Sequence, residues 1–331
     1  MSYYIPQEIL DNIIRCATDD DERNFSNCAS LVSHTFHQIA LPHKFRSLTF
    51  QLHDKENLYS TIIPRPKFCD AINDGDARAL SLAPLVQELS LLEWRGKEGF
   101  DDIFIEKPFE KMINAVFSFR NLTILHMHRC ATSPATMKQL AKLVQLQSLH
   151  TYRCQDMQYV NEWNMDSYSA FSNLQSLHTL VCQENWPCFE SHLACISMKN
   201  LRILKSSDEK VIEALLTTNP SVQLKELWLT GNYYGDYSLL WNYLTRVSSL
   251  THLSMPYLRL TDDLPSLNFP LQELQYLRIN IAFAPCFAHL HLKEMDIDSN
   301  SKPGPLMAEV RQFWRGIVFP HVPGHGSTIY Y

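Results

Sequence analysis

The middle of the chain repeats a nine-residue pattern in which positions 1, 4 and 6 carry leucine or another apolar residue. The clearest matches are LTILHMHRC from Leu122, LQSLHTYRC from Leu146 and LQSLHTLVC from Leu174. Apolar and polar residues alternate at positions 4, 5 and 6, which is the pattern of a β-strand with one buried face. Looser matches start at Val86, Leu201, Leu224, Leu250, Leu274 and Leu292. The pattern therefore predicts a short strand at each of these places.

Segments between the predicted strands carry apolar residues at helical spacing. The predicted helices span residues 109–119, 133–144, 208–219 and 237–247. The expected apolar positions of two of them are Met137, Leu140, Ala141 and Val144, and Val211, Ile212, Leu215 and Leu216. One strand–helix unit cannot bury its apolar face alone, so the units must stack to form a core.

Successive strand starts are mostly separated by about 20 to 29 residues, the period of leucine-rich repeats. We therefore expect an α/β fold, in which parallel inner strands and outer helices form a curved leucine-rich-repeat solenoid. The alternative is accidental leucine patterning in an ordinary α/β protein.

Position 9 of the pattern is cysteine or asparagine in several repeats. These residues are Cys130, Cys154, Cys182, Asn232 and Asn300. An asparagine side chain there can bond backbone groups that lack a partner in the following loop, and a cysteine can fill the same small site as a compact hydrophobe. The cysteines are therefore predicted to be buried and structural.

The first fifty residues lack this repeat and have a helical pattern instead. A first helix is predicted after Pro6, where the first turn accepts proline, and a second over residues 26–40. A short third helix is predicted from Leu41, running into a strand around Leu48–Phe50. So small a unit cannot bury all of its apolar residues. Part of that surface is expected to be an interface or to pack on the first repeats.

The same residues resemble the F-box. The resemblance lies in IPQEIL from Ile5, the pair Ile13–Ile14, the segment LVSHTF from Leu31, and FRSL from Phe45, which is similar to the segment after the motif in many fungal F-box proteins. Ile5 and Phe36 stand where the family has Leu and Trp. The resemblance implies docking on a Skp-family adaptor and, through it, on a cullin that bears a RING protein. The adaptor-binding residues it implies are Ile5, Pro6, Ile9, Leu10, Ile13, Ile14, Leu31, Val32 and Phe36.

Together the two patterns predict four parts. They are an F-box-like unit at 1–50, a connecting segment at 51–84, about nine irregular repeats at 85–300, and a C-terminal cap or tail at 301–331. The implied function is substrate recognition in an SCF-type ubiquitin ligase, with the repeats holding a substrate protein. The alternative is a helical cap on a leucine-rich-repeat scaffold that binds partners without a role in ubiquitin transfer.

Composition and charge argue against several classes of protein. Of the 331 residues, 45% are hydrophobic and 19% are charged, an ordinary globular balance that excludes disorder as the main state. The formal charge of −6 argues against a nucleic-acid partner. Apolar runs never approach the ~18 residues of a membrane span, and no secretion signal opens the chain. Nine scattered cysteines without a CxxC motif suggest a reduced cytoplasmic or nuclear protein.

Catalytic and metal motifs are absent from the sequence. It contains no P-loop, no dinucleotide-binding glycine motif, no HExxH and no GxSxG. One group of possible zinc ligands is His178, Cys182, Cys188, His192 and Cys195. His178 and Cys182 are predicted to lie on opposite faces of one strand, so they cannot easily share an ion. We expect no cofactor, no metal and no enzyme active site.

A candidate substrate surface is predicted from the strand pattern. Positions 1, 4 and 6 point into the core, so positions 3, 5 and 7 project from the sheet. The predicted column at position 5 reads Ser90, His126, His150, His178, Lys205, Trp228, Ser254, Arg278 and Asp296. The candidate substrate-binding residues are His126, Arg129, His150, Arg153, His178, Trp228, Tyr257 and Arg278. Basic residues followed by exposed aromatics suit an acidic or phosphorylated segment with an apolar anchor. The alternatives are a solvated polar sheet face, or binding on the helix side or the loops.

Overall fold

The computed structural model divides the chain into two compact units, Met1–Gln147 and Ser148–Tyr331. The residues that the structure describes are 34–51, 64–94, 111–132, 136, 139–156, 173–184, 199–207, 209–217, 223–231, 237–257, 269–280, 283, 286–287, 289–290 and 292–298.

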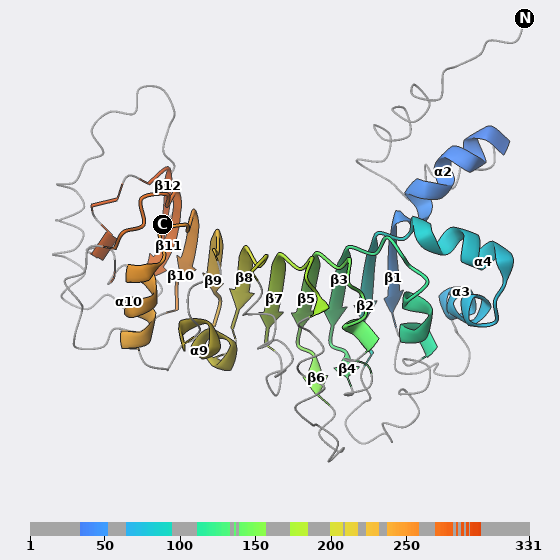
Figure 1. Cartoon of the computed structure of the whole chain (residues 1–331), viewed down its shortest axis with the longest axis horizontal. Coiled ribbons are helices and arrows are strands. Elements are labelled where there is room, and N and C mark those ends of the chain that lie inside the picture. Colours follow the sequence, from blue (N-terminus) through green and yellow to red (C-terminus); the bar gives the residue numbers. More distant parts are fainter. Residues whose placement is uncertain are drawn as a thin grey trace, which may run out of the picture. The chain divides into compact units, whose positions relative to one another are not determined.

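The described part of the first unit contains parallel strands joined by helical segments (Figure 1). Its elements are α2 (His34–Arg46), β1 (Ser47–Gln51), α3 (Pro64–Asn73), α4 (Ala77–Leu82), η1 (Ala83–Leu85), β2 (Glu88–Leu92), β3 (Ile124–His128) and β4 (Ala131–Thr132). Strands β1, β2 and β3 lie side by side and parallel, with Leu48, Leu89 and Leu125 in register. Each of these leucines stands at position 4 of the nine-residue pattern.

The second unit has the same arrangement by itself. Its elements are β5 (Ser148–Tyr152), β6 (Gln155–Asp156), β7 (Thr179–Gln183), β8 (Ile203–Ser206), α9 (Glu209–Thr217), β9 (Glu226–Leu229), α10 (Tyr237–Arg246), β10 (His252–Met255), β11 (Tyr276–Asn280) and β12 (Glu294–Asp298). The order in the sheet is β5-β7-β8-β9-β10-β11-β12, and each neighbouring pair is parallel.

Side chains alternate between the two faces of the strands as the pattern predicts. In β8, for example, Leu204 and Ser206 are buried, whereas Ile203 and Lys205 are half-buried on the opposite face. Parallel strands in register, one from each repeat, with helical segments between them, confirm the predicted α/β leucine-rich-repeat solenoid.

In the described residues, the predicted apolar positions of the helices are buried with one exception, and Met137 lies outside those residues. The stripe Val211, Ile212, Leu215 and Leu216 of α9 is buried, and α9 packs against β8 and α10 (Figure 1). Leu140 and Ala141 are buried too, but Val144 is 55% exposed. The prediction for Val144 is wrong, because residues 141–145 form turns, in which helical spacing does not decide which side chain faces inward.

In six of the repeats, a further buried position lies three residues before the repeat. It is occupied by Ala83, Phe119, Leu143, Leu174, Val247 and Leu271. The amide of Leu146 donates to the carbonyl of Leu143 at 2.8 Å, and the amide of Leu177 donates to Leu174 at 2.9 Å. Equivalent bonds precede the repeats that start at Val86, Leu122 and Leu274. This turn therefore marks where a repeat begins.

The turn corrects the register of one repeat, which begins at Leu177 and not at Leu174. Thr151 of β5 pairs with Cys182 of β7, so Cys182 stands at position 6 and Val181 at position 5. His178 stands at position 2, so its predicted place in the position-5 column is wrong. The template accepts both registers, because leucine occurs at 174, 177 and 180 and all three are buried.

The N-terminal segment joins the repeats directly. The expected break at Leu41 does not occur: α2 runs continuously from His34 to Arg46, with Pro42 inside it. The predicted strand around Leu48 is confirmed as β1, which pairs with β2. A repeat thus starts at Phe45, and α3, α4 and η1 form its helical arm within the segment predicted only as a connection.

Most residues of the F-box resemblance lie outside the described part of the chain. They are Ile5, Pro6, Ile9, Leu10, Ile13, Ile14, Leu31 and Val32. Phe36 lies in α2. The roles predicted for all of them therefore stay predictions, and so does that of the segment from residue 301 onward.

Cys69 in α3 is expected to make the stability of the first unit fall at alkaline pH. Its side chain is 3% exposed, and burial, with a smaller effect of Asp70, raises the pKa of its thiol to about 12 from 9.0. The unfolded chain loses this proton at a lower pH than the folded chain, so stability is full below about pH 9 and falls as pH rises. Between about pH 9 and pH 10.5 we expect a loss of about 2 kcal/mol from this group. Urea unfolding at both pH values measures it, and the Cys69→Ala variant should lack this part of the loss. An equal pH dependence in both proteins would contradict the assignment.

Candidate functional site

The candidate site is the open sheet face, defined as the side chains at positions 3, 5 and 7 of the strands. Most of these side chains in the described strands are half-buried, whereas most residues at positions 4 and 6 are buried. Because these polar and aromatic side chains are partly accessible in the folded strands, they can contact a partner.

In the first unit, the histidines of this face lie beside carboxylates. His126 of β3 has its Nε2 atom 3.2 Å from Oε1 of Glu88 on β2. His128 has its Nδ1 atom 3.8 Å from Glu93, whose Oε1 atom also accepts a bond of 2.8 Å from Arg129. Protonation of either histidine would therefore place a positive charge next to an existing negative one.

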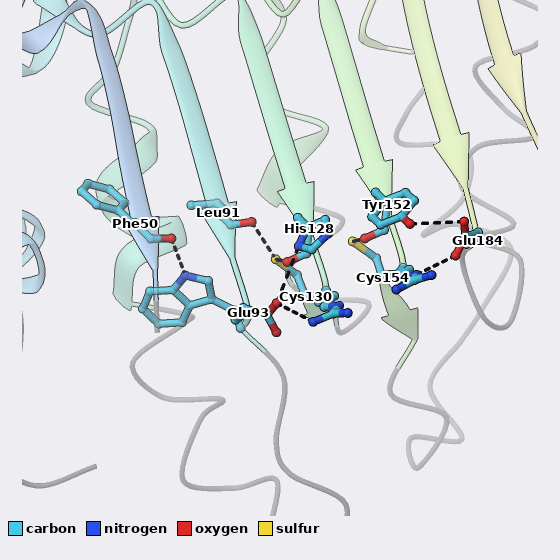
Figure 2. Close-up of polar contacts among 11 residues, drawn as sticks. Phe50, Leu91, Glu93, His128, Cys130, Tyr152, Cys154 and Glu184 are labelled. Atoms are coloured by element: carbon cyan, nitrogen blue, oxygen red, sulfur yellow. Dashed lines mark hydrogen bonds and ion pairs between the residues drawn. The ribbon is translucent and has the colours of Figure 1, made fainter. Parts of the chain in front are cut away.

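Position 8 forms a left-handed turn in four repeats. Glu93, Arg129, Arg153 and Glu184 have φ angles of 60°, 53°, 51° and 52°. This conformation costs a non-glycine residue about 1–2 kcal/mol. In each of the two units, the turn brings an acidic and a basic side chain of adjacent repeats together: Arg129 bonds Glu93, and the Nε atom of Arg153 lies 2.6 Å from Oε2 of Glu184 (Figure 2). Tyr152 also donates to Glu184 at 3.2 Å.

Position 9 links neighbouring repeats through backbone carbonyls. The Cys130 thiol donates to the Leu91 carbonyl at 3.3 Å, and the Trp94 indole donates to the Phe50 carbonyl at 2.9 Å (Figure 2). In both cases the acceptor is the position-6 residue one repeat earlier. The prediction that Cys130 is buried is confirmed. The backbone bond that it makes was predicted only for asparagine at this position, and Trp94 makes an equivalent bond although it is neither Cys nor Asn.

These contacts change the electrostatics predicted for the site. Arg129 and Arg153 are each paired with a glutamate, and Arg278 of β11 lies 3.1 Å from Asp296 of β12. The hydrogen bond from Arg153 lowers the pKa of the Glu184 carboxyl below its ordinary value. The basic residues expected to attract an acidic segment are therefore largely neutralised within the chain.

The second unit gathers aromatic side chains on its open sheet face. We call Lys205, Trp228, His252 and Tyr276 the aromatic platform. The rings of Trp228 and Tyr276 are stacked with centroids 5.4 Å apart, and His252 stacks on Tyr276 at 5.7 Å. The Lys205 ammonium lies 4.4 Å from the centroid of the Trp228 ring. Burial, with a smaller effect of Asp296, raises the pKa of Tyr276 above its ordinary value, so the phenol is neutral at physiological pH.

A small residue between two strands makes this stack possible. Trp228 is on β9 and Tyr276 on β11, so β10 lies between them and the two strands are about 10 Å apart. Rings with centroids 5.4 Å apart must therefore lean toward each other across β10. Ser254, in register with Trp228, leaves room for this and is only 2% exposed although it stands at position 5.

The remaining predicted site residues lie outside the platform. His150 is half-buried at position 5 of β5, His178 stands at position 2, and Tyr257 is 46% exposed just beyond β10. Sequence reasoning placed Lys205 and Trp228 in one column but missed His252 and the grouping as a whole. The available signal was the position-3 pair His252 and Tyr276, which flank the small Ser254.

Within the described residues, no group of three or more His, Cys, Asp or Glu side chains is placed to hold a metal ion. Of the predicted zinc candidates, Cys188, His192 and Cys195 lie outside the described part. No helix that the structure describes is long and apolar enough to cross a membrane.

Comparisons with known proteins give matches to solved structures at low similarity. No protein-family model and no curated protein matches the chain. Among solved structures, an internalin from Listeria monocytogenes is 15% identical, with 69% of this chain and 71% of the internalin covered and a TM-score of 0.36. The structure of a TLR13–ssRNA13 complex is 18% identical, with a TM-score of 0.45. That match covers 78% of this chain and 36% of TLR13, so the chain spans about a third of its length.

Proposed function

We propose that the chain is the substrate-recognition subunit of an SCF-type ubiquitin ligase in the cytoplasm or nucleus. In this proposal, the F-box-like segment docks on a Skp-family adaptor, and through it on a cullin. The open sheet face of the repeats holds a substrate protein. The chain itself performs no bond chemistry and is not an enzyme.

The observation that carries the proposal is the direct junction of an F-box-like sequence with the first repeat. Helix α2 ends at Arg46 and β1 begins at Ser47, and α2 contacts both β1 and η1. Within residues 34–51, therefore, no linker separates α2, which belongs to the F-box-like segment, from the first repeat. Such a subunit works by raising the effective concentration of a substrate lysine at a thioester formed elsewhere, which demands defined geometry.

The second candidate is a leucine-rich-repeat scaffold without a ligase role. The paired charges and aromatic platform of the open sheet face suit protein binding in either case. Adaptor binding alone separates the two candidates.

The Ile9→Asp, Ile13→Asp double variant tests adaptor docking. Both residues belong to the apolar stripe that the F-box resemblance assigns to the adaptor, so each carboxylate would be buried against an apolar partner surface. We expect wild type to recover the adaptor in a pull-down. The double variant should bind the adaptor at least about tenfold more weakly, since a loss of about 1.4 kcal/mol in binding free energy suffices for this.

The matched control is Gln147→Asp with Gln272→Asp, two exposed glutamines in the repeats, which should recover as much adaptor as wild type. Circular dichroism and thermal unfolding establish that all proteins are folded. Equal recovery by the double variant, or none by folded wild type, would favour the scaffold.

A further inference from the structure

Lys205 differs from the arginines of the candidate site in its ion-pair partners. Arg129, Arg153 and Arg278 each pair with a carboxylate of the chain. In the described part of the chain, by contrast, no carboxylate lies within ion-pair distance of the Lys205 ammonium, which rests on the Trp228 ring instead. A cation held on an aromatic face keeps its outward side free for an anion.

The aromatic platform is already held in one arrangement. The Trp228 indole donates to Glu226 at 3.1 Å, its ring is stacked on Tyr276, and Tyr276 is stacked on His252. The His252 ring is in turn bonded to the Thr251 hydroxyl at 3.0 Å. Because these side chains are fixed before binding, a ligand loses little conformational freedom of the protein when it packs on them. Preorganised tryptophan and tyrosine are the residue types that dominate binding energy at interfaces.

Apolar surface continues on the other side of Lys205. Val181 of β7 is in register with Lys205, and Ile203 lies two residues before it on β8; both are half-buried on the open sheet face. Lys205 thus stands among aliphatic and aromatic residues of this face.

We propose that the aromatic platform binds a segment of the partner protein that carries an aromatic side chain next to a single carboxylate. The aromatic side chain packs on Trp228 and Tyr276, and the carboxylate accepts hydrogen bonds from Lys205. This deepens the proposed function, since the segment would be the part of the substrate that the repeats recognise. It rests on substrate binding by the open sheet face and does not require adaptor docking.

Two other ligand chemistries fit the face less well. A phosphorylated or strongly acidic segment would need several free cations, but Arg129, Arg153 and Arg278 are already neutralised. Single-stranded nucleic acid also stacks on aromatic rings, yet it needs a basic groove along its backbone. This chain has a formal charge of −6, and Glu226 and the Arg278–Asp296 pair border the platform.

The test selects peptides on the full chain from a phage-displayed random library. We expect the selected sequences to be enriched in Phe, Tyr or Trp within two residues of Asp or Glu. A fluorescein-labelled synthetic copy of the best sequence then measures affinity by anisotropy. Trp228→Ala should weaken it by about tenfold or more, as for a binding hot spot. Gln183→Ala, on the same face but outside the platform, should leave it unchanged.

Lys205→Gln supplies the decisive comparison. The substitution should weaken binding of a peptide that carries Asp severalfold. It should not change the affinity of the same peptide with Asn in place of Asp, because the change in the protein and the change in the peptide remove the same interaction. Three results would each overturn the proposal. They are the selection of basic peptides, the selection of no peptide by folded protein, and a peptide affinity of the Trp228→Ala variant equal to that of wild type. Tighter binding of oligouridine than of the peptide, lost in the same variant, would overturn it in favour of nucleic acid.

The outcome is separable from that of the proposed function. Trp228→Ala and Lys205→Gln should both retain the adaptor in the pull-down. If wild type binds the peptide but not the adaptor, the ligase role alone is contradicted. If wild type binds the adaptor but no peptide, only the proposal for the aromatic platform is contradicted.

Discussion

Replacing Leu204 with alanine is expected to lower the free energy of unfolding by about 3 kcal/mol. Leu204 stands at position 4 of β8 with 0% of its side chain exposed, in register with Leu180 and Leu227. Its removal leaves a cavity between neighbouring repeats that the paired strands cannot easily close. Urea unfolding monitored by circular dichroism measures the loss.

Ile203→Ala is the matched control for this substitution. Ile203 is the preceding residue of the same strand, but its half-buried side chain lies on the open sheet face. Its truncation should cost about 1 kcal/mol or less, because it removes contact area without leaving an internal cavity. Equal losses at the two positions would contradict the assignment of faces and, with it, the placement of the aromatic platform.

The cysteines of the repeats are expected to resist modification in the folded protein. Cys130, Cys154 and Cys182 are buried, with at most 1% of each side chain exposed. A maleimide can reach them only when the surrounding repeat opens, and an opening free energy of about 4 kcal/mol slows labelling about a thousandfold. Time courses of N-ethylmaleimide labelling, in buffer and in concentrated urea, give the rate of each cysteine by peptide mass spectrometry.

The control for accessibility is Val144→Cys. Val144 is 55% exposed, so a cysteine there should be labelled in the folded protein about as fast as in urea. Rapid labelling of Cys130, Cys154 and Cys182 in a protein that keeps its circular dichroism spectrum would contradict the packing described for these repeats.

The pairing of charges has a consequence for specificity. Glu93–Arg129 and Arg153–Glu184 are exposed enough that each pair adds little stability, and both lie at strained turns. They nevertheless remove the arginines from the set of free cations. The same residue types that suggested an acidic ligand in the sequence are therefore partners of the chain's own glutamates.

Local periodicity is enough to predict most strands of the repeats and several of their helices. A strand repeats every two residues and a helix every 3.6, so Leu204 and Ser206 in β8 and the buried stripe of α9 can be assigned from neighbouring residues alone. The repeat spacing then gives the order of the strands, because a strand–helix unit must stack on its neighbours to bury its apolar face. The leucine-rich-repeat fold follows from these two facts.

Tertiary structure decided the features that depend on contacts between repeats. Leu174 and Leu177 satisfy the same template, and only the pairing of β5 with β7 selects Leu177. Likewise, nothing in the sequence near Arg153 indicates that its partner is Glu184, or that Trp228 stacks on Tyr276 two strands away. Such pairs are distant along the chain and become neighbours only when the strands are in register. The sequence by itself therefore determined most of the buried positions in the repeats, whereas the stacking of repeats decided which surface residues can meet a partner.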